Sequence, residues 1–300
     1  MSVELILSSR AIPAGFARLV WSADRFVDGA SALANNLGVP PLIIGLTIVG
    51  FATSAPELLI SAFAAWDGNS GLAVGNAIGS NITNVALILG FSAMLYPIAV
   101  SSSILKKELP ILFAIMLLGS WMMFDKALTF EEGIVLIVAL FALMSWIVWQ
   151  GLSHPDDPMT QDAAEEIPTD MDTKTAIFWL IVGLAVLLAS SKLLVWGAIN
   201  IAQAFGVSDL VIGLSIVALG TSLPELAATI SCARKGESDI AVGNVIGSNM
   251  FKILGVLGIA AIISPTQLDS AVLQRDIPMM FAVAVLLLVL SLCKGIKSPG

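Results

Sequence analysis

Two short segments of the chain each place a carboxylate beside hydroxyl groups within an apolar stretch. Residues 53–57 read TSAPE and residues 221–225 read TSLPE, so that each segment ends in a glutamate, Glu57 or Glu225. Side chains three and four positions apart share one face of a helix, which brings the Thr and Ser of each segment beside its Glu. The proline of each segment lacks a backbone donor and frees a carbonyl oxygen in the preceding turn. Such hard oxygen ligands suit Na⁺ and Ca²⁺, and charges inside apolar spans are usually functional.

A second pair of related segments follows the first pair. Residues 75–84 read GNAIGSNITN and residues 243–252 read GNVIGSNMFK, with Lys252 at the place of Asn84. Ser80 and Asn84 are four positions apart, so a helix presents both on one face. This pair adds a hydroxyl and an amide to the expected set of oxygen ligands.

The small residues of these segments admit a second explanation. Gly75 and Gly79 allow close contact between helices, and such contact is a common use of small residues in membranes. Packing explains the glycines but does not explain a glutamate in each copy, Glu57 and Glu225. We therefore favour cation binding over packing alone.

The elements that carry these residues are those of an all-α polytopic membrane protein. Of the 300 residues, 57% are hydrophobic and 12% are charged, about half the charge of a soluble domain. Several apolar runs reach roughly 17–25 residues, the length of a helix that crosses a bilayer. Basic residues are too few and too scattered for nucleic-acid binding, and the only histidine, His154, lies outside the apolar runs. We therefore do not expect an enzyme.

The chain contains a long internal repeat. Residues 45–90 align with residues 213–258 without a gap, at an offset of 168 positions and with 22 identities in 46. Glu57 aligns with Glu225, and the register continues outside these segments. The pattern indicates gene duplication.

The first copy is predicted to contain an odd number of membrane spans. We expect helices near residues 12–36, 41–65, 72–96, 108–124 and 131–150, and then near 176–204, 209–233, 240–263 and 276–293. A second copy that follows five spans runs in the opposite direction, which is the inverted-topology repeat of many transporters. The last helix of the second copy would begin near residue 299, so we expect about nine spans, with the second repeat lacking its last helix.

An acidic segment separates the two copies. We assign residues 1–151 to the first repeat, residues 152–174 to an acidic linker and residues 175–300 to the second repeat. The spacing of the acidic residues does not resemble an EF-hand loop, so we interpret the segment as a linker rather than a calcium sensor.

The basic residues predict the orientation. With the N-terminus outside, more basic residues lie on the cytoplasmic side, in accord with the positive-inside rule, and the linker is cytoplasmic. The inside set is Lys106, Lys107, Lys174, Arg234, Lys235, Lys294 and Lys297, and the outside set is Arg10, Lys126 and Arg275. We expect a multi-pass protein of the inner (cytoplasmic) membrane, in contact with membrane lipid.

The paired motifs resemble the α-repeats of the sodium/calcium exchanger family, within the cation/calcium antiporter superfamily. The resemblance covers nearly the whole chain and extends to SADR at residues 22–25, as in prokaryotic members. It implies a central site at which Na⁺ and Ca²⁺ compete, antiport by alternating access, H⁺ or K⁺ as further candidate ions, and no cofactor. Glu57 and Glu225 would be the carboxylate ligands of the metal ion. The complete ligand set implied by position is Gly50, Thr53, Ser54, Glu57, Ser80 and Asn84 from the first half and Ala218, Thr221, Ser222, Glu225 and Ser248 from the second, with backbone carbonyls supplied near Gly50 and Ala218.

Lys252 departs from this family, whose members generally carry Asp or Asn at its position. Three interpretations remain open. The ammonium is a tethered cation, which changes the fixed charge of Glu57 and Glu225 from −2 to −1 and disfavours Ca²⁺. Alternatively it carries a proton in a proton-coupled exchanger, because a buried lysine can lose its proton. In the third interpretation it snorkels to an interface or pairs permanently with a glutamate, and the protein is a transport-impaired ion sensor or scaffold.

Lys192 is a second cation within an expected span. It stands 168 positions after Asp24, so repeat-related positions carry opposite charges. One hypothesis pairs the two side chains across the symmetry axis of the repeat, and the other gives each its own neighbours.

Overall fold

The computed structural model describes residues 3–100, 104–153, 171–206 and 218–294, and these residues are almost entirely helical. The acidic linker predicted at 152–174 lies mostly outside the described residues. The first helical segments are α1 (Val3–Leu37), then α2 (Pro41–Ile44), η1 (Gly45–Val49) and α3 (Gly50–Trp66), then α4 (Ser70–Thr83), η2 (Asn84–Leu89) and α5 (Gly90–Leu95), then η3 (Ile104–Glu108) and α6 (Leu109–Met122), and α7 (Phe130–Ser153). After the linker come α9 (Thr173–Ala204), then α11 (Ala218–Thr221) and α12 (Leu223–Lys235), then α13 (Ser238–Phe251), η5 (Lys252–Val256) and α14 (Leu257–Ile263), and η6 (Val272–Asp276) with α15 (Ile277–Lys294).

Six of these helical segments are long and apolar enough to cross a membrane. They span Pro41–Trp66, Ser70–Leu95, Phe130–Gln150, Thr173–Ala204, Ser238–Ile263 and Val272–Leu292. The prediction of an all-α polytopic membrane protein is therefore confirmed. Helix α1 is longer than expected, since it begins at Val3 rather than near residue 12.

The helix boundaries follow local sequence. Pro41 stands in the first turn of α2, where its missing N–H has no partner to lose. Gly236 ends α12 with φ 81°, a left-handed conformation that costs glycine little. Pro224 has no N–H to donate to the Gly220 carbonyl oxygen, which instead accepts a hydrogen bond from Ser191 Oγ at 2.8 Å, and the helix is interrupted at Ser222, between α11 and α12.

Backbone irregularities recur at the offset of the sequence repeat. The labels η mark π-helical turns, in which one extra residue is inserted into the helix. Element η2 begins at Asn84 and η5 at Lys252, while η3 begins at Ile104 and η6 at Val272. Both pairs are 168 positions apart, so the duplicated segments share backbone geometry as well as residues. The inverted orientation of the two halves and their boundaries stay predictions.

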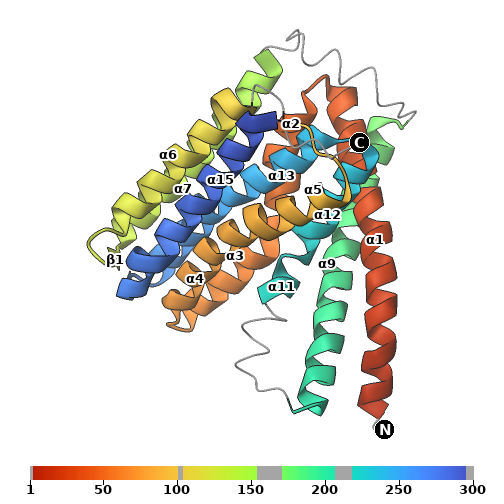
Figure 1. The fold of residues 1–300 in the computed structure, drawn as a ribbon, viewed down its shortest axis with the longest axis horizontal. Helices are drawn as coiled ribbons and strands as arrows, with labels where there is room; N and C mark the ends of the chain where they lie inside the picture. Colours follow the sequence, from red (N-terminus) through yellow and green to blue (C-terminus); the bar gives the residue numbers. More distant parts are fainter. Residues whose placement is uncertain (1–2, 101–103, 154–170, 207–217, 295–300) are drawn as a thin grey trace.

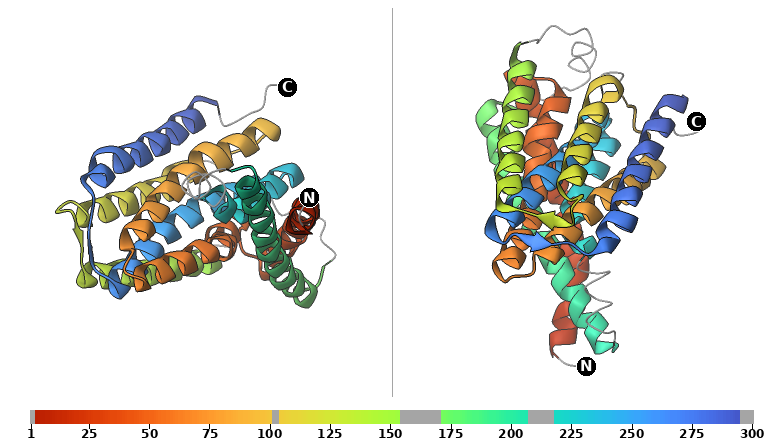
Figure 2. Two further views of the ribbon diagram at one scale, coloured as in Figure 1. Left: turned by 90° about the horizontal axis from the view of Figure 1, so that it is seen from below. Right: turned by 90° about the vertical axis from the view of Figure 1, so that its left-hand side faces the viewer.

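Helices α1 and α9 lie side by side and project beyond the other helices (Figures 1 and 2). Helix α13 runs through the middle of the remaining helices (Figure 1). Its span, Ser238–Ile263, is the most buried of the six, with 83% of its most apolar stretch buried inside the protein. Two short strands, β1 (Ala127–Leu128) and β2 (Thr266–Gln267), pair antiparallel at one end and join the loops after α6 and α14.

Glycines bring α13 into backbone contact with α2 and η1. A Cβ added to Gly243 would lie 2.9 Å from the Leu42 carbonyl oxygen, and one added to Gly45 would lie 2.8 Å from that of Ile240. A Cβ on Gly247 would collide with the backbone of Leu46. Small residues thus hold α13 against the element that leads into α3.

The equivalent contact in the first copy would involve residues outside the described part of the chain. Among the described residues, no atom lies within 4 Å of a Cβ built on Gly75 or Gly79. By the repeat, their packing partners fall at residues 210–214, outside the described residues. The packing role of these two glycines stays a prediction.

Ion pairs connect α1 to α12. Asp24 Oδ1 lies 2.6 Å from an Arg234 guanidinium nitrogen and accepts a hydrogen bond from Ser231 Oγ at 2.6 Å. Lys235 Nζ lies 2.5 Å from Asp28 Oδ1. Among the described residues Asp24 pairs with Arg234 and forms no ion pair with Lys192, which is exposed on α9, so the hypothesis that Lys192 pairs with Asp24 is wrong. Repeat-related positions need not meet, because each faces its own surroundings.

Candidate cation-binding site

The two glutamates of the repeated motifs converge on one ammonium group. Glu57 from α3 and Glu225 from α12 are both fully buried. Lys252 Nζ lies 3.5 Å from Glu57 Oε1 and 3.1 Å from Glu225 Oε1. The expectation that the two carboxylates face a common buried position is thus met in the structure.

Lys252 is held entirely inside the protein. It follows α13 as the first residue of the π-helical turn η5, and its side chain is 0% exposed. The interpretation in which it snorkels to an interface is therefore wrong. When all three groups are ionised, the ammonium reduces the negative charge of the site from −2, for Glu57 and Glu225 alone, to −1. Each carboxylate thereby gains an opposite charge in a place where an unpaired charge is costly.

Two serines from different repeats bridge to Glu225. Ser54 Oγ lies 2.5 Å from Ser248 Oγ, and Ser248 Oγ donates a hydrogen bond to Glu225 Oε1 at 3.3 Å. Ser54 Oγ lies 3.4 Å from the same carboxylate oxygen. The hydroxyl of Ser54 thus reaches the carboxylate of the other repeat, and Ser248 links Ser54 to the same carboxylate oxygen.

The amide of Asn84 is oriented by the second repeat. Its Nδ2 donates to Ser248 Oγ at 3.1 Å and to Asn249 Oδ1 at 2.9 Å, which uses both amide hydrogens. Within the described part of the chain, its buried Oδ1 accepts no hydrogen bond. Glu57 Oε2 and Glu225 Oε2 also lack hydrogen bonds to described residues. Buried oxygens without partners are rare, and here three of them border the site where a cation would need ligands.

A pair of asparagines that we did not predict supports the two motifs. Asn76 Nδ2 donates to Ser61 Oγ at 2.9 Å and to the Glu57 carbonyl oxygen at 3.4 Å. Asn244 Nδ2 makes the repeat-equivalent bonds, to Thr229 Oγ1 at 3.0 Å and to the Glu225 carbonyl oxygen at 3.4 Å. The signal that could have found them is their identity in GNAIG and GNVIG. Both asparagines fix the backbone that carries a carboxylate.

The remaining hydroxyls of the first motif contact this framework. Thr53 Oγ1 donates to Asn244 Oδ1 and lies 3.0 Å from both that atom and the Val49 carbonyl oxygen. Ser80 Oγ donates to the Asn76 carbonyl oxygen and lies 3.2 Å from Asn76 Oδ1. Both hydroxyl oxygens keep lone pairs that a cation could use.

The other predicted ligands are Gly50, Ala218, Thr221 and Ser222. Gly50 approaches α13 closely, since a Cβ there would lie 2.9 Å from the Ser248 backbone nitrogen. Thr221 and Ser222 stand at the junction of α11 and α12, within one turn of Glu225, and Ala218 begins α11. The proposed role of the carbonyls near Gly50 and Ala218 stays a prediction. No group of three or more His, Cys, Asp or Glu side chains able to hold a metal ion occurs in the described residues, so any cation here would rely on hydroxyls and amides beside the two carboxylates.

Comparison with known proteins assigns the chain to a family. Residues 11–149 and 175–298 match the sequence model of the sodium/calcium exchanger protein family. The chain belongs to the sodium/calcium exchanger family. This family consists of transporters rather than enzymes. Membership of it supports a multi-pass membrane protein that exchanges Ca²⁺ for another cation.

Several relatives match nearly the whole length of the chain. The "Putative antiporter CaxA" of Alkalimonas amylolytica is 49% identical, over 97% of this chain and 92% of the relative. The sodium/calcium exchanger MaX1 of Methanosarcina acetivorans is 32% identical, over 92% of this chain and 88% of the relative. The solved structure of the sodium-calcium exchanger NCX_Mj superposes with a TM-score of 0.85 at 29% identity, covering 99% of this chain and 93% of that chain. The prokaryotic affiliation predicted from the motifs is confirmed.

Proposed function

We propose that the protein is a secondary active antiporter that exchanges Na⁺ for Ca²⁺, or for a related cation, by alternating access, and that Lys252 modifies the charge of its site. The observation that carries this proposal is the convergence of Glu57 and Glu225, from the two repeats, on one buried position. Membership of the sodium/calcium exchanger family supports it.

Charge compensation explains why such a site would exchange ions. Two buried carboxylates without counterions are costly, so a carrier with an empty site resists the change that moves the site between the two sides of the membrane. Bound cations remove that cost, and either ion of the exchange can do so. With Lys252 paired to both carboxylates, one monovalent cation neutralises the remaining charge, whereas one Ca²⁺ overcompensates it. We therefore propose weaker Ca²⁺ binding and fewer bound Na⁺ ions than a site with a neutral residue at this position would show.

The membrane arrangement belongs to the same proposal. We place the N-terminus outside and the linker inside, with two inverted repeats around the site, in the inner membrane of the cell. The name of a relative, the inner membrane protein YrbG of Escherichia coli, supports the location; it is 38% identical over 94% of this chain.

Transport by purified protein in reconstituted vesicles tests the proposal. We expect uptake of ⁴⁵Ca²⁺ into Na⁺-loaded vesicles, no uptake by Glu57→Gln, and faster, more Ca²⁺-selective uptake by Lys252→Asn and Lys252→Asp. Thr47→Val, a change outside the ligand set, serves as the control. If neither substitution of Lys252 alters rate or selectivity, its proposed effect on the site is refuted. Uptake by Glu57→Gln at the wild-type rate would refute the site itself.

A second candidate function follows from the same ion pairs. Because Lys252 contacts both carboxylates, it can serve as a permanent counterion, and the protein would then be a transport-impaired sensor or scaffold. In that case the wild-type chain transports no cation, while Lys252→Asn restores Na⁺-dependent uptake. A pH gradient imposed across the same vesicles in the absence of Na⁺ distinguishes the proton-coupled alternative, which alone predicts uptake driven by that gradient.

A further inference from the structure

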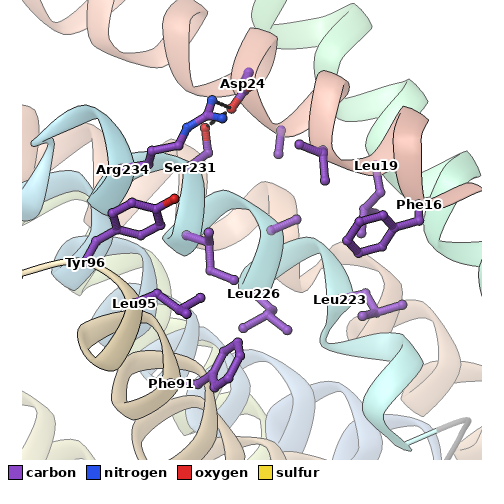
Figure 3. Close-up of a pocket in the computed structure, with 14 residues that line it drawn as sticks. Phe16, Leu19, Asp24, Phe91, Leu95, Tyr96, Leu223, Leu226, Ser231 and Arg234 are labelled. Atoms are coloured by element: carbon purple, nitrogen blue, oxygen red, sulfur yellow. Dashed lines mark hydrogen bonds and ion pairs between the residues drawn. The ribbon is translucent and has the colours of Figure 1, made fainter.

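A groove opens between α1, α5 and α12, and neither buried glutamate lines it. Its volume is about 480 Å³, within the range of sites that bind small ligands (Figure 3). The wall is mostly apolar and includes Phe16 and Leu19 from α1, Phe91 and Leu95 from α5, and Leu223 and Leu226 from α12. Of these, Phe16 is 60% exposed and Leu95 is 50% exposed. Where the groove lies within a bilayer, such exposed apolar side chains would contact hydrocarbon rather than water.

The groove is polar at one end only. Asp24, Ser231 and Arg234 gather at that end beside Tyr96, while Phe16 and Leu223 lie at the other (Figure 3). The groove follows α12 from Leu223 to Arg234, which is about 16 Å at 1.5 Å per helical residue. An elongated apolar channel with one charged end matches an amphiphile with a long hydrocarbon chain.

The charged end retains capacity for a ligand. Arg234 pairs with Asp24 through one guanidinium nitrogen, at 2.6 Å, yet its side chain is 42% exposed. A guanidinium has five N–H donors and suits the oxygens of a phosphate, so several donors remain for a second acceptor. The hydroxyl of Ser231 is already donated to Asp24, which leaves Arg234 as the principal phosphate-binding group.

We infer that this groove binds one membrane phospholipid, with an acyl chain along α12 and its phosphate on Arg234. Hydrocarbon fills the apolar part, because a water-filled apolar groove within a bilayer would be unfavourable and the neighbouring solvent is lipid. The predicted orientation places Arg234 on the cytoplasmic side, where anionic lipids attract basic residues. The bound lipid would join α1 to α12, the helix that carries Glu225.

The acyl-chain assignment is tested by lipid retention. The full-length protein, extracted in mild detergent and washed, is analysed by native mass spectrometry after incubation with phosphatidylglycerol. We expect one retained lipid on the wild type, and at least about tenfold weaker retention by Leu95→Trp, whose larger side chain occupies the groove. The matched control is Leu290→Trp on α15, a leucine that is 52% exposed and does not line the groove. Equal retention by both variants, or none by the wild type, overturns the assignment.

The headgroup assignment needs a separate comparison. Phosphatidylglycerol, phosphatidylethanolamine and diacylglycerol with identical chains distinguish phosphate binding from binding of the chains alone. We expect both phospholipids to be retained about tenfold better than diacylglycerol, the difference of one charge-assisted contact, and Arg234→Gln to abolish that difference. Asp24→Asn breaks the same ion pair but keeps the guanidinium, so it should retain phospholipid. If Asp24→Asn loses lipid as Arg234→Gln does, or diacylglycerol binds equally well, Arg234 is not the phosphate-binding group. Neither measurement depends on cation transport.

Discussion

Lys252 Nζ lies 3.1 Å from Glu225 Oε1, and both side chains are completely shielded from solvent. A protein-borne cation thus occupies the space between the repeats where the family assignment leads us to expect a transported ion. The attraction is strong because the pair is buried, and the same burial makes each charge costly without the other. The predictions below test what this arrangement does to stability and to ion binding.

Removal of the ammonium should make stability depend on cations. In Lys252→Gln, Glu57 and Glu225 face each other without a counterion, and loss of one partner of a buried pair typically costs about 3–5 kcal/mol. Thermal unfolding of the purified variant can be monitored by the fluorescence of the seven tryptophans. In choline chloride we expect the variant to unfold at a markedly lower temperature than the wild type. Added Na⁺ or Ca²⁺ should restore the unfolding temperature of the variant, and it should raise that of the wild type less, because the wild-type site keeps a fixed charge of only −1. A variant as stable as the wild type without added cation would contradict the ion-pair account.

The Asn244 side chain should contribute more to the free energy of unfolding than its small size suggests. It accepts a hydrogen bond from Thr53 and donates to Thr229 and to the Glu225 carbonyl oxygen. Asn244→Ala leaves these buried groups unpaired, so we expect a loss of about 1–3 kcal/mol in the free energy of unfolding. Chemical denaturation of the purified variant in detergent measures this loss of stability. Asn35→Ala, at an exposed position of α1, is the control and should have almost no effect. Similar values for the two variants would exclude a supporting role for Asn244.

Gly247 should not tolerate even alanine. A Cβ there collides with the backbone of Leu46, and backbone atoms cannot move aside as a flexible side chain can. We expect Gly247→Ala to lower the unfolding temperature and to reduce ⁴⁵Ca²⁺ uptake, because α13 carries Ser248 into the site and leads directly into Lys252. Gly71→Ala, where no described residue comes near the added Cβ, should be neutral or slightly stabilising in its helix. A well-folded, fully active Gly247→Ala protein would show that the close approach of α13 is dispensable.

An acidic residue at Asn84 should shift ion preference. Asn84→Asp keeps the shape of the side chain and returns the fixed charge of the site to −2 with Lys252 present. We expect Ca²⁺ to compete more effectively with Na⁺, and we would measure this by isothermal titration of the purified protein with each ion. Asn84→Ala removes the oxygen that lacks a partner without adding charge, and it should weaken both ions. Unchanged affinities in both variants would place Asn84 outside the ligand set.

Much of this protein is determined by local and repetitive patterns in its sequence. Apolar run length predicted an all-α membrane protein because the thickness of a bilayer sets the length of a span. The 168-residue offset predicted equivalent segments, and π-helical turns recur at that offset at Asn84 and Lys252. Glu57 and Glu225 stood out because a charge in an apolar span is costly wherever the span lies.

Other features were decided only by tertiary structure. Sequence left three interpretations of Lys252 open, and the structure excluded snorkelling by placing its ammonium between Glu57 and Glu225. The pairing of Asp24 with Arg234 rather than Lys192, and the orientation of the Asn84 amide by Asn249, were likewise not predicted. Such contacts join residues far apart in the chain, 194 positions for Ser54 and Ser248. Periodicity reports which face of a helix is buried, but electrostatic and hydrogen-bond energies depend on interatomic distance and direction, and only the packing of distant helices sets these.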